Sequence, residues 1–204
     1  MSTLTLTVIY SIPLILFFLI AWITQTKLYN TIDQHSEMET SVPAESVAQT
    51  VLKENAVSVR IEKSEDYTQN NYDSENGKIL LSPNTIGQKD ITSIGFAVHA
   101  ANEAIEAKKR PSYVQRRRKL VIVETISFWV AFSILAMGLM SGSLQTVLAG
   151  YATALFPAAI HFCNTKYDLQ RSRKLCEVLR SLNIFNEKEI YSLRNVLRAI
   201  VLKY

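Results

Sequence analysis

Two residues of the segment ITSIGFAVHAANEA, residues 91–104, carry side chains that could bind a metal ion. His99 and Glu103 are four residues apart, so on a helix they share one face. An imidazole nitrogen and a carboxylate oxygen are both zinc ligands, and a rebuilt metal site could add His161 and Asp168. Taken alone, a histidine and a glutamate at this spacing are more typical of a packed histidine and a solvated helix face.

The sequence indicates little other catalytic chemistry. It contains no Gly-rich phosphate loop, no GxSxG elbow and no CxxC pair. Cys163 and Cys176 are not spaced as a metal or redox pair, so we expect reduced, structural thiols. The strongest basic run abuts an apolar segment, which favours a place at a membrane surface over nucleic-acid binding; it consists of Arg116, Arg117, Arg118 and Lys119.

Three apolar segments determine how the rest of the chain is arranged. They cover residues 4–23, 120–140 and 144–163, and each is long enough to cross about 30 Å of hydrocarbon as a helix. The link at 141–143 allows only a tight turn. For residues 4–23 we favour a retained anchor over a cleaved signal peptide, because no Lys or Arg precedes the run. The sequence therefore predicts a mostly α membrane protein with three transmembrane helices.

Two polar residues fall within the second and third apolar segments. Glu124 lies about one turn into the second segment, and His161 lies near the end of the third. A carboxylate inside a bilayer is costly unless it is paired or close to the interface. We interpret both residues as interfacial, with a buried functional acid at Glu124 as the alternative.

Lys and Arg residues gather on one side of this three-span arrangement. They follow the first segment, precede the second and follow the third, whereas the N-terminal tip and the 141–143 link carry none. Such residues mark the inner side of a membrane. The distribution predicts an N-terminus outside, with the polar domain and the C-terminal segment inside.

The polar residues between the first two spans predict a small α+β domain. Apolar residues at helical spacing follow Pro43, and Asp90 can cap a helix over residues 91–109. Between them, residues 57–61 and 78–81 have strand patterns, with a turn over 70–77, which predicts a two-stranded hairpin.

The C-terminal segment also has a helical pattern. Asn186 and Glu189 have the spacing of a capping box. The apolar face that follows could lie on the membrane, bind a partner, or pack onto the chain's own domain; it comprises Ile190, Leu193, Val196, Leu197, Ile200 and Val201.

The order of these elements resembles the membrane-embedded bacterial neutral zinc metallopeptidases, whose zinc-binding helix contains the string HEVGHA. Tyr72-Asp73 followed by residues 78–82 is similar to the strand and turn before that helix, and residues 91–104 resemble the helix itself. Tyr167-Asp168 with residues 171–173 resembles the family's basic segment after a later span. The resemblance implies a zincin-like domain.

The departures from the family pattern fall on its catalytic positions. His99 matches the first zinc ligand, but Ala100 stands where the glutamate base would be and Glu103 where the second histidine would be. The third ligand falls at or near Lys166, whose ammonium has no lone pair for a metal. We expect no bound cofactor, and an ion pair between Glu103 and Lys166 in place of the metal.

These observations predict four regions: an anchor at 1–27, an α+β domain at 28–119, a transmembrane hairpin at 120–164 and a helical tail at 165–204. The predicted function is that of a catalytically inactive metallopeptidase-like protein, a structural or interaction subunit of a larger membrane complex. The alternative is an active zinc-dependent peptidase with an altered metal site.

We expect the lipid bilayer and other membrane-protein subunits as partners, not nucleic acid, in a bacterial inner membrane or an organelle membrane. The family continues into another span where this chain reaches Tyr204, so we also expect an exposed apolar helix end that a partner could cover.

Overall fold

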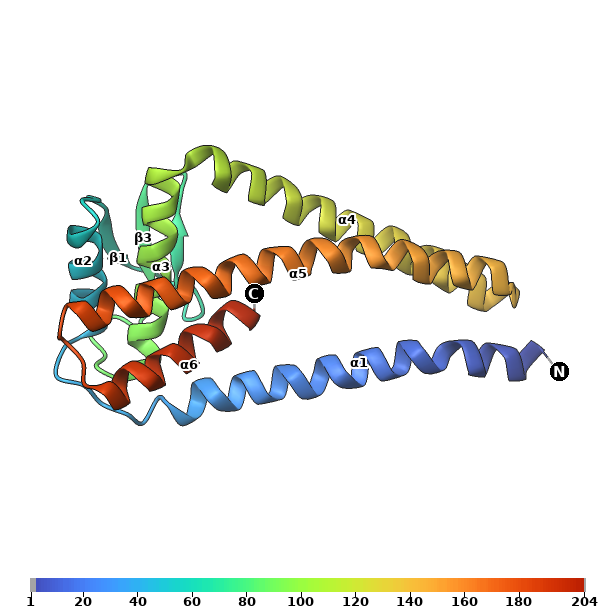
Figure 1. Cartoon of the computed structure of the whole chain (residues 1–204), viewed down its shortest axis with the longest axis horizontal. Coiled ribbons are helices and arrows are strands. Elements are labelled where there is room, and N and C mark those ends of the chain that lie inside the picture. The colour runs from blue at the N-terminus through green and yellow to red at the C-terminus, as the bar shows by residue number, and fades with distance from the viewer. Residues whose placement is uncertain (1–2, 204) are drawn as a thin grey trace. The chain divides into compact units, whose positions relative to one another are not determined.

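The structure is a computed structural model and describes residues 3–203 (Figure 1). Its elements follow one another in the order α1 (Thr3–Gln34), α2 (Ala44–Glu54), β1 (Arg60–Lys63), β2 (Asn71–Asp73), β3 (Lys78–Leu81), α3 (Ile91–Lys109), α4 (Pro111–Ser141), α5 (Leu144–Ser181) and α6 (Glu187–Lys203). They divide into two compact units. We call residues up to Thr26 with Gln115–Lys166 the helical unit, and Lys27–Val114 with the residues from Tyr167 onward the α+β unit.

Two helices, α4 and α5, are long and apolar enough to cross a membrane. Both extend well beyond the predicted spans: α4 begins at Pro111 and α5 continues to Ser181. Proline is tolerated in the first turn of a helix, and nothing between Pro111 and Leu120 interrupts the helix. The first apolar segment forms α1, and its crossing of a membrane stays a prediction, as does the orientation.

A glycine turn closes the predicted tight link between α4 and α5. Gly142 has a φ of +65°, and its N–H donates to the Leu139 carbonyl. The N–H of Ser143 donates to the Gly138 carbonyl at 3.1 Å, which completes a Schellman motif. The Ser143 hydroxyl then accepts from the Thr146 N–H and caps α5. The turn thus ends one helix and starts the next within two residues.

Glycine also lets α4 and α5 approach closely. A Cβ at Gly138 would lie 2.6 Å from the backbone nitrogen of Val147, and one at Gly150 would lie 2.8 Å from that of Leu135. Small residues at such crossings bring helix backbones into contact, which is a common way for transmembrane helices to associate.

We expect Gly138→Val to lower the free energy of unfolding of the helical unit by about 1–3 kcal/mol, because a backbone atom of α5 cannot move aside for the new side chain. Titration of the protein from mild detergent into SDS, followed by circular dichroism, measures this change. Ser133→Val at an exposed position of α4 is the control. Equal effects of the two substitutions would show that the close approach does not stabilise the hairpin.

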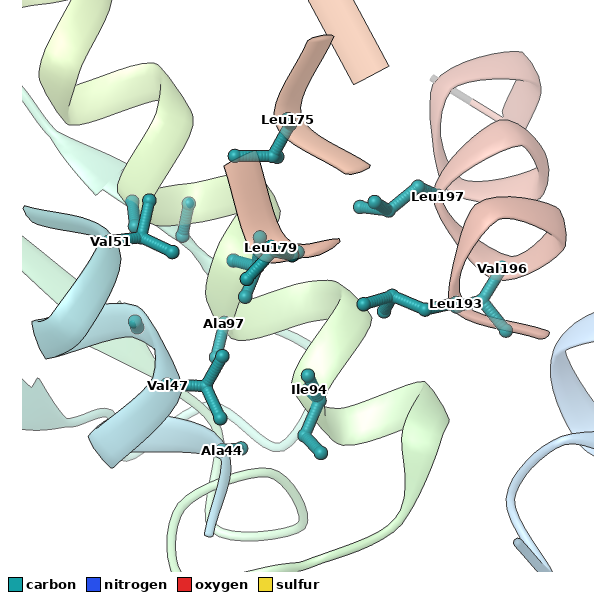
Figure 2. Close-up of a cluster of buried hydrophobic side chains, with 14 of the residues drawn as sticks. Ala44, Val47, Val51, Ile94, Ala97, Leu175, Leu179, Leu193, Val196 and Leu197 are labelled. Atoms are coloured by element: carbon teal, nitrogen blue, oxygen red, sulfur yellow. The ribbon is translucent and has the colours of Figure 1, made fainter. Parts of the chain in front are cut away.

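In the α+β unit, α3 lies at the centre and contacts α2, α6, β2 and β3. The predicted apolar face of α2 is buried: Ala44, Val47, Ala48, Val51 and Leu52. Figure 2 shows Val47 and Val51 of α2, Ile94 and Ala97 of α3, and Leu175 and Leu179 of α5 in one cluster, with Leu193 and Leu197 of α6 beside them. The core is therefore built from segments that lie far apart in the sequence.

The apolar face of α6 packs against its own domain, which decides between the alternatives left open by the sequence. Leu193, Val196, Leu197 and Ile200 are fully buried. A Cβ at Gly95 would lie 2.6 Å from Cγ1 of Val196, so α6 and α3 are in close contact. The prediction of an exposed apolar helix end was wrong for this face, because α3 covers it.

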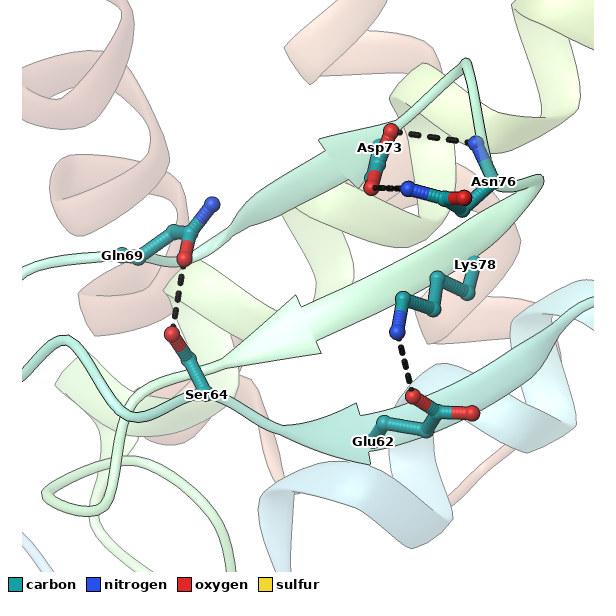
Figure 3. Close-up of polar contacts among 6 residues, drawn as sticks. All are labelled: Glu62, Ser64, Gln69, Asp73, Asn76 and Lys78. Carbon is teal, nitrogen blue, oxygen red and sulfur yellow. Dashed lines mark hydrogen bonds and ion pairs between the residues drawn. The ribbon is translucent and has the colours of Figure 1, made fainter.

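The sheet has three strands in the order β1-β3-β2, so the predicted two-stranded hairpin was wrong. β1 begins at Arg60 and pairs with β3 in parallel, whereas β2 pairs with β3 in an antiparallel register. The physical reason is that part of the expected turn is itself a strand. The chain turns after β1, where the Ser64 hydroxyl donates to Gln69, and returns as β2 (Figure 3).

The turn between β2 and β3 ends at Asn76-Gly77, as the sequence predicted. Asp73 accepts hydrogen bonds from the Asn76 side chain and backbone, which lower the pKa of its carboxyl (Figure 3). Gly77 has a φ of +65°. Lys78 of β3 donates to Glu62 of β1 at 2.7 Å, and this bond raises the pKa of the lysine.

Both predicted helix caps are confirmed. The Asp90 carboxylate accepts from the Ser93 N–H at 2.8 Å. Asn186 and Glu189 exchange hydrogen bonds of 2.7 and 2.9 Å, which is the reciprocal pattern of a capping box.

Candidate functional site

The predicted pair on α3 lies on one face of the helix, as its spacing requires. The Nε2 atom of His99 is 3.7 Å from the Oε1 atom of Glu103, and both side chains are partly exposed. The second carboxylate oxygen of Glu103 accepts from the backbone N–H of Tyr72 in β2 at 3.3 Å. Glu103 thus connects α3 to the edge of the sheet.

Ala100, between these two residues, faces the interior. It is 0% exposed and belongs to the main hydrophobic cluster together with Ala97, Ala101 and Ala104. At this position the protein holds no proton-accepting group, and the core leaves no solvent-exposed space for a longer side chain.

The residues near His99 do not match a catalytic zinc site. Such a site uses three protein ligands and one open position for water, whereas His99 and Glu103 supply two donors. Among residues 3–203, no group of three or more His, Cys, Asp and Glu side chains is placed to hold a metal ion. The rebuilt site would join His161 of the helical unit to residues of the α+β unit, and it stays a prediction.

His161 has another contact within the helical unit. His161 Nδ1 lies 2.9 Å from Glu124 Oε1 in the helical unit, and Asn164 donates to the other oxygen of Glu124. Lys166 is the last residue of the helical unit, whereas Glu103 lies in the α+β unit. The Glu103–Lys166 ion pair stays a prediction.

Sequence reasoning missed a cluster of charged residues one turn beyond Glu103. Arg171 of α5 lies 3.6 Å from Glu106 of α3 and 3.7 Å from Asp168, and it donates to the Asn102 carbonyl. The guanidinium also lies over the ring of Tyr167. The Arg171, Glu106 and Asp168 side chains are only 12%, 17% and 13% exposed. The spacing of these charged residues in the sequence could have indicated the cluster. Glu106 follows Glu103 by three residues on α3, and Arg171 follows Asp168 by three residues on α5.

The basic run Arg116–Lys119 lies near the start of α4 in the helical unit. Arg116, Arg118 and Lys119 are exposed, and Arg117 is partly buried. Their predicted position at a membrane surface stays a prediction.

The two cysteines differ in environment, since Cys163 is exposed and Cys176 is buried. Burial raises the pKa of the Cys176 thiol to about 11, against the opposing effect of the nearby Arg194 and Arg180. Because the folded state disfavours its thiolate, this thiol contributes stability below about pH 9 that is lost as the pH rises towards 11.

We therefore expect Cys176 to react about a hundredfold more slowly with Ellman's reagent in the folded protein than after unfolding at pH 8, since the thiolate is the reacting form. The Cys163→Ser variant isolates this thiol. Equal rates in the folded and unfolded protein would contradict the buried position.

The fold and site together define a class: a mostly helical chain with two candidate membrane-spanning helices and a small mixed domain around one buried helix. Residues 10–204 match the model of the family described as "Putative neutral zinc metallopeptidase", and the chain belongs to that family. No curated protein and no solved structure matches the chain.

Proposed function

We propose that this protein is a catalytically inactive member of its family, acting as a membrane-anchored structural or interaction subunit. The observation that carries the proposal is Ala100. It occupies the position where the family resemblance puts the general base, and it is fully buried in the core. Hydrolysis by a metal-bound water requires a group that takes its proton, and alanine has none.

The residue at the second ligand position supports the same interpretation. Glu103 accepts a hydrogen bond from the backbone N–H of Tyr72 in the edge strand β2, which satisfies a donor that β3 does not face. Its carboxylate therefore has a structural role between α3 and the sheet. The Arg171 cluster adds a second polar connection, between α3 and α5. Contacts among protein side chains thus stabilise the part of the fold where the family has a metal.

One observation favours the alternative, an active peptidase with an altered metal site. His99 and Glu103 keep two metal-binding side chains on one face, 3.7 Å apart. A metal held by this pair would need further ligands from water, substrate or another chain, and a different proton acceptor. We regard this as the second candidate because it requires those additional groups.

Purification from native membranes tests the proposed role as a subunit. The full-length protein, with a tag at its C-terminus, is extracted in mild detergent and sized by native electrophoresis, and the proteins that accompany it are identified by mass spectrometry. We expect a discrete assembly with fixed stoichiometry that survives a second purification step. A monomer without partners would contradict the role as a subunit.

A further inference from the structure

Two exposed surfaces of the α+β unit carry opposite charges. One is a basic strip along α6, and the other is the acidic turn between β1 and β2. We propose that the acidic turn of one copy of the chain docks on the α6 strip of a second copy. The proposal concerns copies of this chain alone, so it does not rest on the proposed role as a subunit of a larger complex.

The α6 strip is cationic along its length. Among the described side chains of α6 after Glu187, the exposed ones are three or four positions apart, so they follow one side of the helix. The strip is ten residues long, which corresponds to about 15 Å. Three of its four side chains are cations, and the fourth is aromatic: Lys188, Tyr191, Arg194 and Arg198.

The charge of the α6 strip is not neutralised within the chain. Its three cations form no ion pair among residues 3–203. The acidic residues of α6 are already used elsewhere, since Glu187 pairs with Arg180 at 2.8 Å and Glu189 accepts from the Asn186 N–H. The strip therefore presents a net positive charge to a partner.

The turn between β1 and β2 presents the opposite charge. Glu65 and Asp66 are both exposed, and the neighbouring Tyr67 is 66% exposed. Residues 64–77 contain four acidic residues and no Lys or Arg. The turn therefore offers two adjacent carboxylates and one aromatic ring.

Local hydrogen bonds order this turn before any partner binds. The Ser64 hydroxyl donates to Gln69 at 2.7 Å (Figure 3), and it accepts from the Asp66 N–H at 3.0 Å. Asp66 Oδ1 accepts from the backbone N–H and the hydroxyl of Thr68, and these bonds lower the pKa of the Asp66 carboxyl. A turn that is already ordered loses little conformational entropy on binding.

The two surfaces match in chemistry and spacing. A guanidinium group binds a carboxylate with two parallel hydrogen bonds. Arg194 and Arg198 are four residues, or about 6 Å, apart along α6. The Cα atoms of Glu65 and Asp66 are about 3.8 Å apart, so each flexible carboxylate can reach its own arginine. Each surface also exposes a tyrosine, a residue type that is common among the dominant contacts of protein interfaces.

The buried face of α6 argues against a membrane surface as the occupant of the strip. An amphipathic helix binds a bilayer through its apolar side chains. Those of α6, including Val196 and Ile200, are buried against α3. A contact between two different surfaces leaves each pair of copies with one unused turn and one unused strip, so further copies can extend it into a ring or a row.

Energy transfer between labelled copies of the full-length protein tests the proposal. Donor and acceptor dyes are attached to separate samples at the exposed Cys163, which lies in the helical unit and outside both surfaces. The samples are mixed, reconstituted into phosphatidylcholine vesicles and measured at low and at high salt. Circular dichroism checks the fold of every variant.

Two variants and one control separate this contact from a general effect of charge. The strip variant reverses the three cations of α6: Lys188→Glu/Arg194→Glu/Arg198→Glu. The turn variant is Glu65→Lys/Asp66→Asn, in which position 66 keeps an oxygen that can accept from Thr68. The control reverses three exposed charges elsewhere in the α+β unit: Lys53→Glu/Arg60→Glu/Lys89→Glu. Because the variants alter different elements, either one tests the contact if the other does not fold.

We expect energy transfer between native copies and between control copies at low salt, and its loss at high salt, where exposed charges are screened. Either variant by itself should associate at least about tenfold more weakly, because like charges then face each other. Mixing the donor-labelled strip variant with the acceptor-labelled turn variant should restore the transfer, since each turn then faces a strip of opposite charge.

Four results would overturn the proposal: no transfer between native copies, transfer that persists within either variant, an equal loss in the control, or no recovery in the mixture of the two variants. Loss of native transfer when phosphatidylglycerol replaces part of the phosphatidylcholine would overturn it as well, because a lipid surface would then occupy the strip. None of these results depends on zinc or on other proteins, so this proposal and the proposed function fail separately.

Discussion

The substitution Arg171→Met should lower the free energy of unfolding of the α+β unit by about 3–5 kcal/mol, the usual cost of breaking a buried ion pair by removing one partner. Arg171 is the cation between Glu106 and Asp168, and all three side chains are largely buried. Without it, two largely buried carboxylates lose the cation that each of them faces. Urea denaturation of the full-length protein in detergent, followed by circular dichroism, measures the loss.

Arg173→Met provides a matched control, because Arg173 lies on the same helix and is exposed. It should change the free energy of unfolding by less than about 0.5 kcal/mol. Adding Glu106→Gln to Arg171→Met should recover part of the loss, because one of the stranded charges is then neutral. If Arg171→Met were no worse than Arg173→Met, the cluster would not hold α5 against α3.

Ala100→Glu, which introduces the family's glutamate at the base position, should destabilise the α+β unit by about 3–5 kcal/mol. The side chain is larger than the space in the core allows, and overpacking alone typically costs about 1–3 kcal/mol. A carboxyl group at a position with no exposure also loses its contact with water. The same urea denaturation measures the effect.

The control for this substitution is Ala107→Glu, which makes the same change two turns later on α3, where the side chain is partly exposed. We expect a change of less than about 1 kcal/mol there. A stable Ala100→Glu protein would show that the position can still hold a base, and it would weaken the interpretation of Ala100 as part of a sealed core.

Local signals in the sequence were sufficient to predict much of the α+β unit. The caps at Asp90 and Asn186 depend on residues close to each other in the chain, and both are confirmed. The buried face of α2 follows from apolar residues at helical spacing. The parallel pairing of β1 with β3 could not be predicted in this way, because it depends on how residues 64–70 turn the chain between two short strands.

The candidate site was predictable only in part. The shared face of His99 and Glu103 follows from helix geometry, but the contact between Glu103 and Tyr72 joins residues 31 positions apart. The Arg171 cluster likewise joins α3 to α5, and α6 reaches α3 from the far end of the chain. These long-range contacts depend on tertiary packing, for which a single sequence contains no direct signal.

The zinc content of the purified full-length protein tests the central claim most directly. The protein is expressed with added zinc, dialysed against metal-free buffer, and measured by elemental analysis beside the His99→Ala variant, with hydrolysis of an unfolded protein substrate assayed on the same samples. We predict that native protein and variant contain equal zinc, well below one ion per chain, and have no hydrolysis above background. One zinc ion per chain, together with hydrolysis that is abolished by His99→Ala, would contradict the claim and establish an active peptidase.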